Sequence, residues 1–133
     1  MLSKLHHVGI VVRHLETAYA FYRDTLSLPV HREARLEDQG VRAALLTIGE
    51  SEIELLEPID PETGVGRFLA RRGEGLHHLC FATEDVSREL DIARAKGLPL
   101  IDSQPRPWLA GLICFLHPKA SHGVLIEYAQ PLA

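Results

Sequence analysis

Two six-residue stretches decide the fold of this chain. They are Leu5-His6-His7-Val8-Gly9-Ile10 and, 71 residues later, Leu76-His77-His78-Leu79-Cys80-Phe81. The same landmarks follow each stretch in the same order: Leu28-Pro29-Val30 corresponds to Leu98-Pro99-Leu100, and Ile53-Glu54-Leu55 to Ile126-Glu127-Tyr128. Ordered landmarks at a nearly constant offset indicate an internal repeat. We therefore predict a single domain of two modules, residues 1–58 and 76–133, joined by a linker at 59–75.

Each module is expected to contain one strand, one helix and three further strands. Alternating apolar and β-branched residues predict strands, whereas apolar spacing of three and four residues predicts helices. In the first module we expect a helix over 16–26 and strands over 5–12, 30–36, 41–48 and 53–57. In the second we expect a helix over 86–96 and strands over 76–83, 99–103, 111–117 and 123–129. The linker is expected to add a short helix over 65–72.

The predicted fold class is α+β, built from two tandem βαβββ modules. One such module by itself would leave one face of its small sheet exposed to solvent. Two modules side by side are expected to form an open, eight-stranded, barrel-like sheet with an internal groove. Equivalent positions of the two modules would then face each other across this groove.

The repeated histidine pairs are the first candidates for a functional site. Side chains alternate between the two faces of a strand. His7 and His78 are followed on their own face by small residues, which leaves room for a ligand, so we assign them to the groove. The same alternation assigns His6 and His77 to the helix side or the rim.

Two carboxylates complete the candidate site. Glu54 and Glu127 occupy equivalent places in the two modules, each between apolar neighbours. A buried carboxylate is costly unless it is paired or binds a metal ion. Two neutral imidazoles and two carboxylates suit a divalent cation with one or two open positions. Co²⁺, Mn²⁺, Ni²⁺, Zn²⁺ and Fe²⁺ all fit this set of ligands.

Composition narrows the function classes. The 133 residues include 14 Lys and Arg against 18 Asp and Glu, a formal net charge of −4. The chain has no run of five or more basic residues and no apolar run long enough to cross a membrane, so neither nucleic acid nor a membrane is expected as a partner. Cys80 and Cys114 both lie in apolar runs, which is typical of buried thiols in a reducing cytoplasm.

These motifs resemble the vicinal oxygen chelate superfamily, which includes glyoxalases, bleomycin resistance proteins and extradiol dioxygenases. Within it, the chain is most similar to the methylmalonyl-CoA epimerases. The resemblance rests on the two histidine stretches and on four further strings: Glu37-Asp38-Gln39-Gly40-Val41, Ile53-Glu54-Leu55-Leu56-Glu57-Pro58, Phe115-Leu116-His117-Pro118-Lys119 and Gly123-Val124-Leu125-Ile126-Glu127. Together these strings span nearly the whole chain.

The resemblance implies a metal-dependent enzyme. It places the metal ligands at His7, Glu54, His78 and Glu127, the same four residues as the repeat. It implies removal of the α-proton of a 2-alkylmalonyl-CoA, such as methylmalonyl-CoA, through a metal-stabilised enolate. Glu127 is the expected base and Glu54 the second candidate. Lys119 is a candidate contact for a CoA phosphate, and relatives of this type commonly form homodimers.

The chain departs from the epimerase pattern in two places. Some relatives carry a glutamate base on the strand after Gln-Gly-Val, where this chain has Ala43. A different group must then serve one face of the substrate. The stretch Pro105–Leu112 is apolar and holds one glycine where epimerases are glycine-rich. Trp108 in this stretch is expected either in an exposed loop or in the wall of a substrate pocket.

Two other functions compete with the epimerase. One is another metal-dependent reaction of the superfamily, that of a glyoxalase-like lyase or isomerase or of an extradiol-type dioxygenase. The other is a non-catalytic protein of the same fold that binds a small molecule. A complete set of four ligands argues against a simple binding protein. A dioxygenase usually holds iron with two histidines and one carboxylate, so the fourth ligand counts against that reaction.

Overall fold

The structure is a computed structural model that describes residues 1–109 and 111–132. Ala110 and Ala133, which fall within the second predicted module, lie outside the described residues. The chain divides into two compact units. The N-terminal unit is Val8–His77; the C-terminal unit combines Met1–His7 with the chain from His78 onward. Strands β1 (Leu2–Val11) and β5 (Gly75–Thr83) each contribute residues to both units.

The predicted βαβββ order is found in both modules. The first has β1, helix α1 (Leu15–Tyr19) with the π-helical turn η1 (Ala20–Thr25), and then β2 (Val30–Leu36), β3 (Val41–Ile48) and β4 (Ser51–Pro58). The second has β5, α3 (Val86–Ala95), β6 (Arg106–Trp108), β7 (Gly111–Leu116) and β8 (Ile126–Gln130). Between them lies α2 (Gly64–Arg72), the linker helix expected over 65–72. Short 3₁₀ turns follow β2 (η2, Glu37–Gln39) and β7 (η3, Pro118–Ala120).

The strand order repeats as the sequence does. Hydrogen bonds join the strands in the order β2-β3-β4-β1-β5-β8-β7-β6. In each module the first strand is therefore followed by the fourth, the third and the second. The predicted α+β class with eight strands is confirmed. None of the helices in the described part of the chain has the length and hydropathy that a membrane crossing requires.

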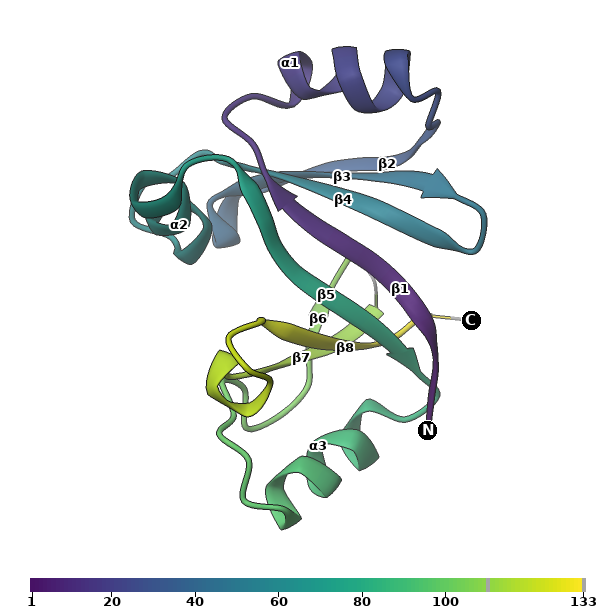
Figure 1. Cartoon of the computed structure of the whole chain (residues 1–133), viewed down its shortest axis with the longest axis vertical. Helices are drawn as coiled ribbons and strands as arrows, with labels where there is room; N and C mark the ends of the chain where they lie inside the picture. Colours follow the sequence, from purple (N-terminus) through teal and green to yellow (C-terminus); the bar gives the residue numbers. More distant parts are fainter. Residues whose placement is uncertain (110, 133) are drawn as a thin grey trace. The chain divides into compact units, whose positions relative to one another are not determined.

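In the N-terminal unit, α1 covers one face of β2, β3 and β4 (Figure 1). Leu15 and Tyr19 of α1 pack against Ala44, Leu46 and Leu55 of the strands and against Val12, the residue after β1. The backbone N–H of Leu15 donates to Glu57 Oε1 at 2.8 Å, so a carboxylate from β4 stabilises the first turn of this short helix. The chain then widens into η1, where the N–H of Leu26 bonds the carbonyl of Phe21, five residues back.

Polar and charged side chains also connect α1 to this face of the sheet. Arg42 of β3 contacts Glu16 of α1 at 3.0 Å and Glu57 of β4 at 3.2 Å, and the Tyr19 hydroxyl donates to Glu33 of β2. Because alternate residues of a strand share a face, Arg42, Ala44 and Leu46 turn toward α1. Ala43 and Leu45 therefore belong to the opposite face. Glu54, paired directly with Leu45, belongs to that face too.

In the C-terminal unit, α3 lies along β7 and β8 (Figure 1). Asp85 is the N-cap of this helix, and its side chain accepts the backbone N–H of Arg88 at 3.0 Å. Val86 and Leu90 pack against Cys114 of β7, with Tyr128 of β8 beside them. Residues one step along these strands form a second cluster on the opposite face: Cys80, Ile113 and Ala129, with Trp108 and Phe115 against them. Trp108 is thus part of the packing rather than exposed loop material.

One predicted strand is displaced. We expected a strand over 99–103, but the structure has an isolated bridge from Leu100 to Leu116 and places β6 at Arg106–Trp108. The Asp102 side chain explains the break. Its Oδ2 accepts the N–H of Phe115 at 2.8 Å, while its own N–H bonds the carbonyl of Phe115. The Asp102 side chain thus accepts the Phe115 N–H, which a backbone carbonyl of a neighbouring strand would otherwise accept. Regular pairing with β7 begins only at Arg106.

Gly40 illustrates a turn that needs glycine. It ends η2 at a φ of 66°, in the left-handed region, immediately before β3. A Cβ atom at this position would lie 2.4 Å from the Thr63 methyl group. Any other residue would be strained both by its backbone and by this contact.

Candidate metal centre

Three of the four predicted ligands converge in the C-terminal unit. His7 comes from β1, His78 from β5 and Glu127 from β8, and their exposed fractions are 0%, 5% and 1%. The Nε2 atom of His7 lies 3.0 Å from Nε2 of His78 and 3.0 Å from Oε1 of Glu127. The Nε2 atom of His78 lies 2.9 Å from the same oxygen. The three donor atoms thus form a nearly equilateral triangle.

Strand register explains this convergence. Cys80 of β5 pairs directly with Glu127 of β8, and Phe115 of β7 pairs with Glu127 from the other side. Tyr128 packs toward α3, so its neighbour Glu127 belongs to the other face. His78 shares that face, and its ring contacts the ring of Phe115 edge-on at 5.6 Å. The alternation that was read from the sequence therefore brings these side chains together.

Glu127 is held by only one of its two oxygens. Burial by itself would raise the pKa of this carboxyl, but the hydrogen bonds from His7 and His78 outweigh burial and lower the pKa to about 2. Glu127 is therefore ionised at neutral pH. Within the described residues, its Oε2 atom is buried and has no hydrogen-bond partner. An unpaired buried carboxylate oxygen is costly unless it binds a cation or acts on a substrate.

The spacing of the donors fits a metal ion. Atoms bound about 2.1 Å from one ion and 90° apart lie about 3.0 Å from each other, whereas tetrahedral neighbours lie about 3.4 Å apart. The observed separations of 2.9 and 3.0 Å match adjacent positions of a site with 90° angles. Three protein ligands of this kind would leave open positions for substrate oxygens on a five- or six-coordinate ion. The residues present therefore fit a divalent cation.

Glu54, the fourth predicted ligand, belongs to the N-terminal unit. It lies on β4, is 1% exposed, and belongs to the face of the sheet opposite α1. Ala43, at the position where some relatives carry a glutamate, lies on the same face and is fully buried. Its direct partner is Leu56, two residues from Glu54. The Glu54 carboxylate therefore lies on the same face as residue 43 and close to it, where some relatives carry a glutamate and this chain has alanine.

The other histidines of the repeat have different surroundings. His77 contacts Phe68 of α2, with the ring centroids 5.0 Å apart, in line with its predicted place on the helix side or rim. His6 was given the same place, yet it is only 9% exposed and its ring contacts the ring of His7. Donor atoms of His6, His7 and Cys80 lie within 4.8 Å of one another. Strand alternation does not predict this contact, because the contact depends on how far the His6 ring extends and not only on the face of the strand from which the side chain leaves.

Lys119 lies on turn η3, where its backbone N–H donates to Nδ1 of the His117 ring at 3.0 Å.

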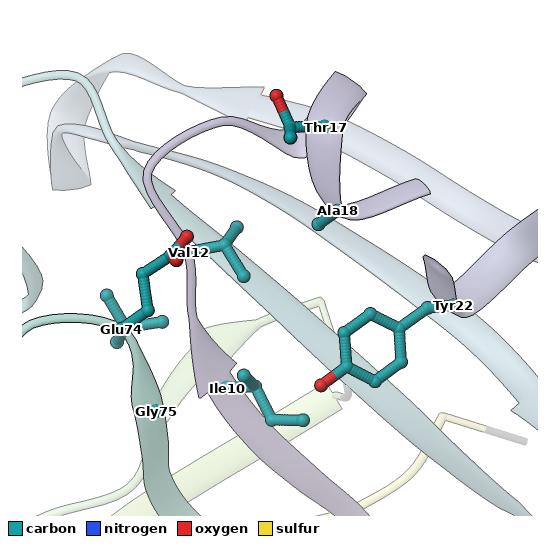
Figure 2. Close-up of a pocket in the computed structure, with 8 residues that line it drawn as sticks. Ile10, Val12, Thr17, Ala18, Tyr22, Glu74 and Gly75 are labelled. Carbon is teal, nitrogen blue, oxygen red and sulfur yellow. The ribbon is translucent and has the colours of Figure 1, made fainter. Parts of the chain in front are cut away.

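The N-terminal unit also holds a cavity of about 300 Å³ beside α1. Its lining includes Ile10 of β1, Val12 just after β1 and Tyr22 of η1, with Glu74 as the one carboxylate among the lining residues. Figure 2 shows the Tyr22 ring and the Ile10 side chain turned toward one another. None of the predicted ligands lines this cavity.

Comparisons with known proteins agree with the geometry. Residues 6–115 match the profile of the Glyoxalase/Bleomycin resistance protein/Dioxygenase superfamily. The chain is 35% identical to an ethylmalonyl-CoA/methylmalonyl-CoA epimerase of Cereibacter sphaeroides, over 98% of this chain and 99% of that protein. It is 34% identical to the uncharacterised protein YqjC of Bacillus subtilis, over 98% and 94% of the two chains.

A solved structure gives the same picture. A variant of methylmalonyl-CoA epimerase from Streptomyces coelicolor, in complex with 2-nitronate-propionyl-CoA, is 39% identical with a TM-score of 0.95. The alignment covers 100% of this chain and 97% of that one. The resemblance that the sequence motifs carried is therefore confirmed over the full length.

Proposed function

Since this chain belongs to the Glyoxalase/Bleomycin resistance protein/Dioxygenase superfamily, we propose that it is a metal-dependent epimerase of 2-alkylmalonyl-CoA thioesters such as methylmalonyl-CoA. The observation that carries the proposal is the convergence of His7, His78 and Glu127 on one buried point, with one Glu127 oxygen left free. Substrate specificity within this class follows from the similarity to named epimerases.

The proposed site holds a divalent cation, Co²⁺, Mn²⁺, Ni²⁺, Zn²⁺ or Fe²⁺, at His7, His78 and Glu127, with Glu54 as the predicted fourth ligand. When bound, such an ion acidifies the proton between the thioester and carboxylate groups of the substrate by polarising their oxygens. The burial of the site excludes water, so the charge that develops there is poorly screened by solvent.

Glu127 is the proposed base. Its Oε1 lies within 3.0 Å of the two histidine Nε2 atoms, where a metal ion would bind, so Oε2 is the oxygen that accepts the α-proton. A free glutamate carboxylate, with a pKa of about 4.3, is already a weak base, so Glu127 can act only on a strongly acidified proton. Return of a proton to the opposite face needs a second group. Glu54 is the candidate, since its neighbour Ala43 has no side chain for this role.

Four finer assignments extend the proposal. The partner is an acyl-CoA, and Lys119 on its exposed turn is a candidate contact for a CoA phosphate. A homodimer and a reducing cytoplasmic environment stay predictions from the sequence.

The experiment that tests this function is α-proton exchange in D₂O. Protein stripped with chelator and reloaded with Co²⁺ is incubated with methylmalonyl-CoA, ethylmalonyl-CoA, and propionyl-CoA as the control without the second carboxylate. Deuterium should enter the two malonyl thioesters only, and only with the reloaded protein. The fold of the stripped protein should survive, because a core of this size closes without the ion. Absence of exchange in metal-loaded protein would overturn the epimerase in favour of a lyase or a binding protein.

A further inference from the structure

The contact between His6 and His7 is a feature that the proposed reaction does not use. The two Nδ1 atoms lie 2.8 Å apart, and the rings meet edge-on with centroids 5.0 Å apart and planes 80° apart. Both side chains are buried, at 9% and 0% exposure. Two ring nitrogens at this distance share a hydrogen bond, in which one nitrogen donates and the other accepts.

Binding of a metal ion at Nε2 of His7 would set the direction of this bond. This Nε2 atom faces His78 and Glu127, each at 3.0 Å. A neutral imidazole that gives its Nε2 lone pair to a metal ion keeps its proton on Nδ1. The Nδ1–H group of His7 then donates to His6, whose Nδ1 must be unprotonated. The neutral His6 ring consequently carries its proton on Nε2.

We propose that His6 is a positioning residue that holds His7 in the tautomer and ring orientation needed to bind the metal ion. The inference rests on the proposed metal site. Metal-bound histidines usually donate their second ring nitrogen to an acceptor, and loss of that acceptor lowers metal affinity by about 10- to 100-fold. A neutral imidazole performs this role without adding negative charge to the ligand set.

The repeat provides a built-in comparison. His77 holds the position in the second module that His6 holds in the first. Its ring meets the ring of Phe68 at 5.0 Å and 69°. A phenyl ring has no lone pair to accept an N–H proton from a neighbouring histidine. The two pairs thus show different ring contacts: His6 lies against the ring of His7, whereas His77 lies against Phe68 of α2.

The test is a Co²⁺ titration followed by visible absorption, with wild type, His6→Ala, His6→Asn and His77→Ala. His6→Ala should weaken binding by about 10- to 100-fold. His6→Asn should restore most of it, because the Asn Oδ1 atom takes the place of the His6 Nδ1 acceptor. His77→Ala, the matched control, should bind as wild type does. Thermal unfolding checks that each variant folds, and the asparagine variant keeps the test valid if the alanine variant does not.

A second readout separates positioning from packing. In ¹⁵N-histidine NMR of the Zn²⁺-loaded protein, the Nδ1–H proton of His7 should be observed downfield in wild type and in His6→Asn, where an acceptor holds it, and should shift upfield and exchange faster with solvent in His6→Ala. Unchanged affinity together with an unchanged His7 Nδ1–H signal in His6→Ala would overturn the inference while leaving the metal site intact. Appearance of a cobalt–thiolate absorption band in wild type would also overturn it, because Cys80 and its neighbour His6 would then be metal ligands. If wild type binds no Co²⁺, the proposed function fails along with it.

Discussion

At the scale of single residues, Glu127 has the most unusual environment among the predicted ligands. Burial opposes its charge, yet the His7 and His78 rings hold the pKa at about 2. One oxygen is fixed by these rings and the other has no partner among the described residues. Such an asymmetric carboxylate can be a ligand through one oxygen and a base through the other.

Glu127→Gln tests the two roles separately. The amide keeps the shape and one oxygen able to bind the ion, but it removes the base. We expect α-proton exchange with methylmalonyl-CoA to slow by about 10²- to 10⁴-fold while Co²⁺ stays bound. Glu54→Gln is the matched comparison and should slow exchange less if Glu54 is mainly a ligand. Exchange at the wild-type rate in Glu127→Gln, with metal bound, would show that another group is the base.

At the scale of elements, strand β3 presents two different faces. Arg42 and Ala44 turn toward α1, where ion pairs and apolar contacts hold the helix. Ala43 turns the other way and shares its face with Glu54 of β4, through the Leu45–Glu54 and Ala43–Leu56 pairs. A change at Ala43 therefore acts on the Glu54 side of the sheet without touching α1.

Ala43→Glu should add a second carboxylate beside Glu54. We expect epimerisation to rise by up to about 10²-fold, because proton return no longer depends on a ligand carboxylate. The buried charge should also lower the melting temperature. Ala43→Gln, with similar volume and no charge, is the control for crowding. If both variants epimerise at the same rate with metal bound, the second carboxylate has no catalytic role.

At the scale of the whole molecule, buried ionisable groups make the fold sensitive to alkali. Burial, together with the negative charges of Asp102 and Glu127, raises the pKa of Cys114 to about 12. Burial and the hydrogen bond to Glu33 raise the pKa of Tyr19 well above its usual range. The unfolded chain loses these protons at lower pH than the folded chain does, starting near 9 for the thiol. Unfolded protein then binds fewer protons than native protein, and stability falls as the pH rises.

We therefore expect the free energy of unfolding to decrease between pH 9 and 11, by up to about 1.4 kcal/mol per pH unit for each such group. Cys114→Ala removes one group, so its stability should fall less steeply with pH, although it starts lower because the thiol packs against α3. Urea unfolding at pH 7.5, 9, 10 and 10.5 measures both slopes. Parallel slopes for wild type and variant would contradict the assignment to Cys114.

The sequence by itself determined the repeat, the α+β class, and the meeting of His7, His78 and Glu127. These features follow from period-two alternation and from a constant offset, both of which are local properties of the chain. The placing of β6 after the break at Asp102 depended instead on a side chain that reaches β7, a contact that no local pattern encodes. The His6–His7 bond and the free Glu127 oxygen likewise appeared only in the tertiary structure. Strand alternation tells which face a side chain leaves from, whereas ring orientation and hydrogen-bond partners are decided by what other strands bring to that face.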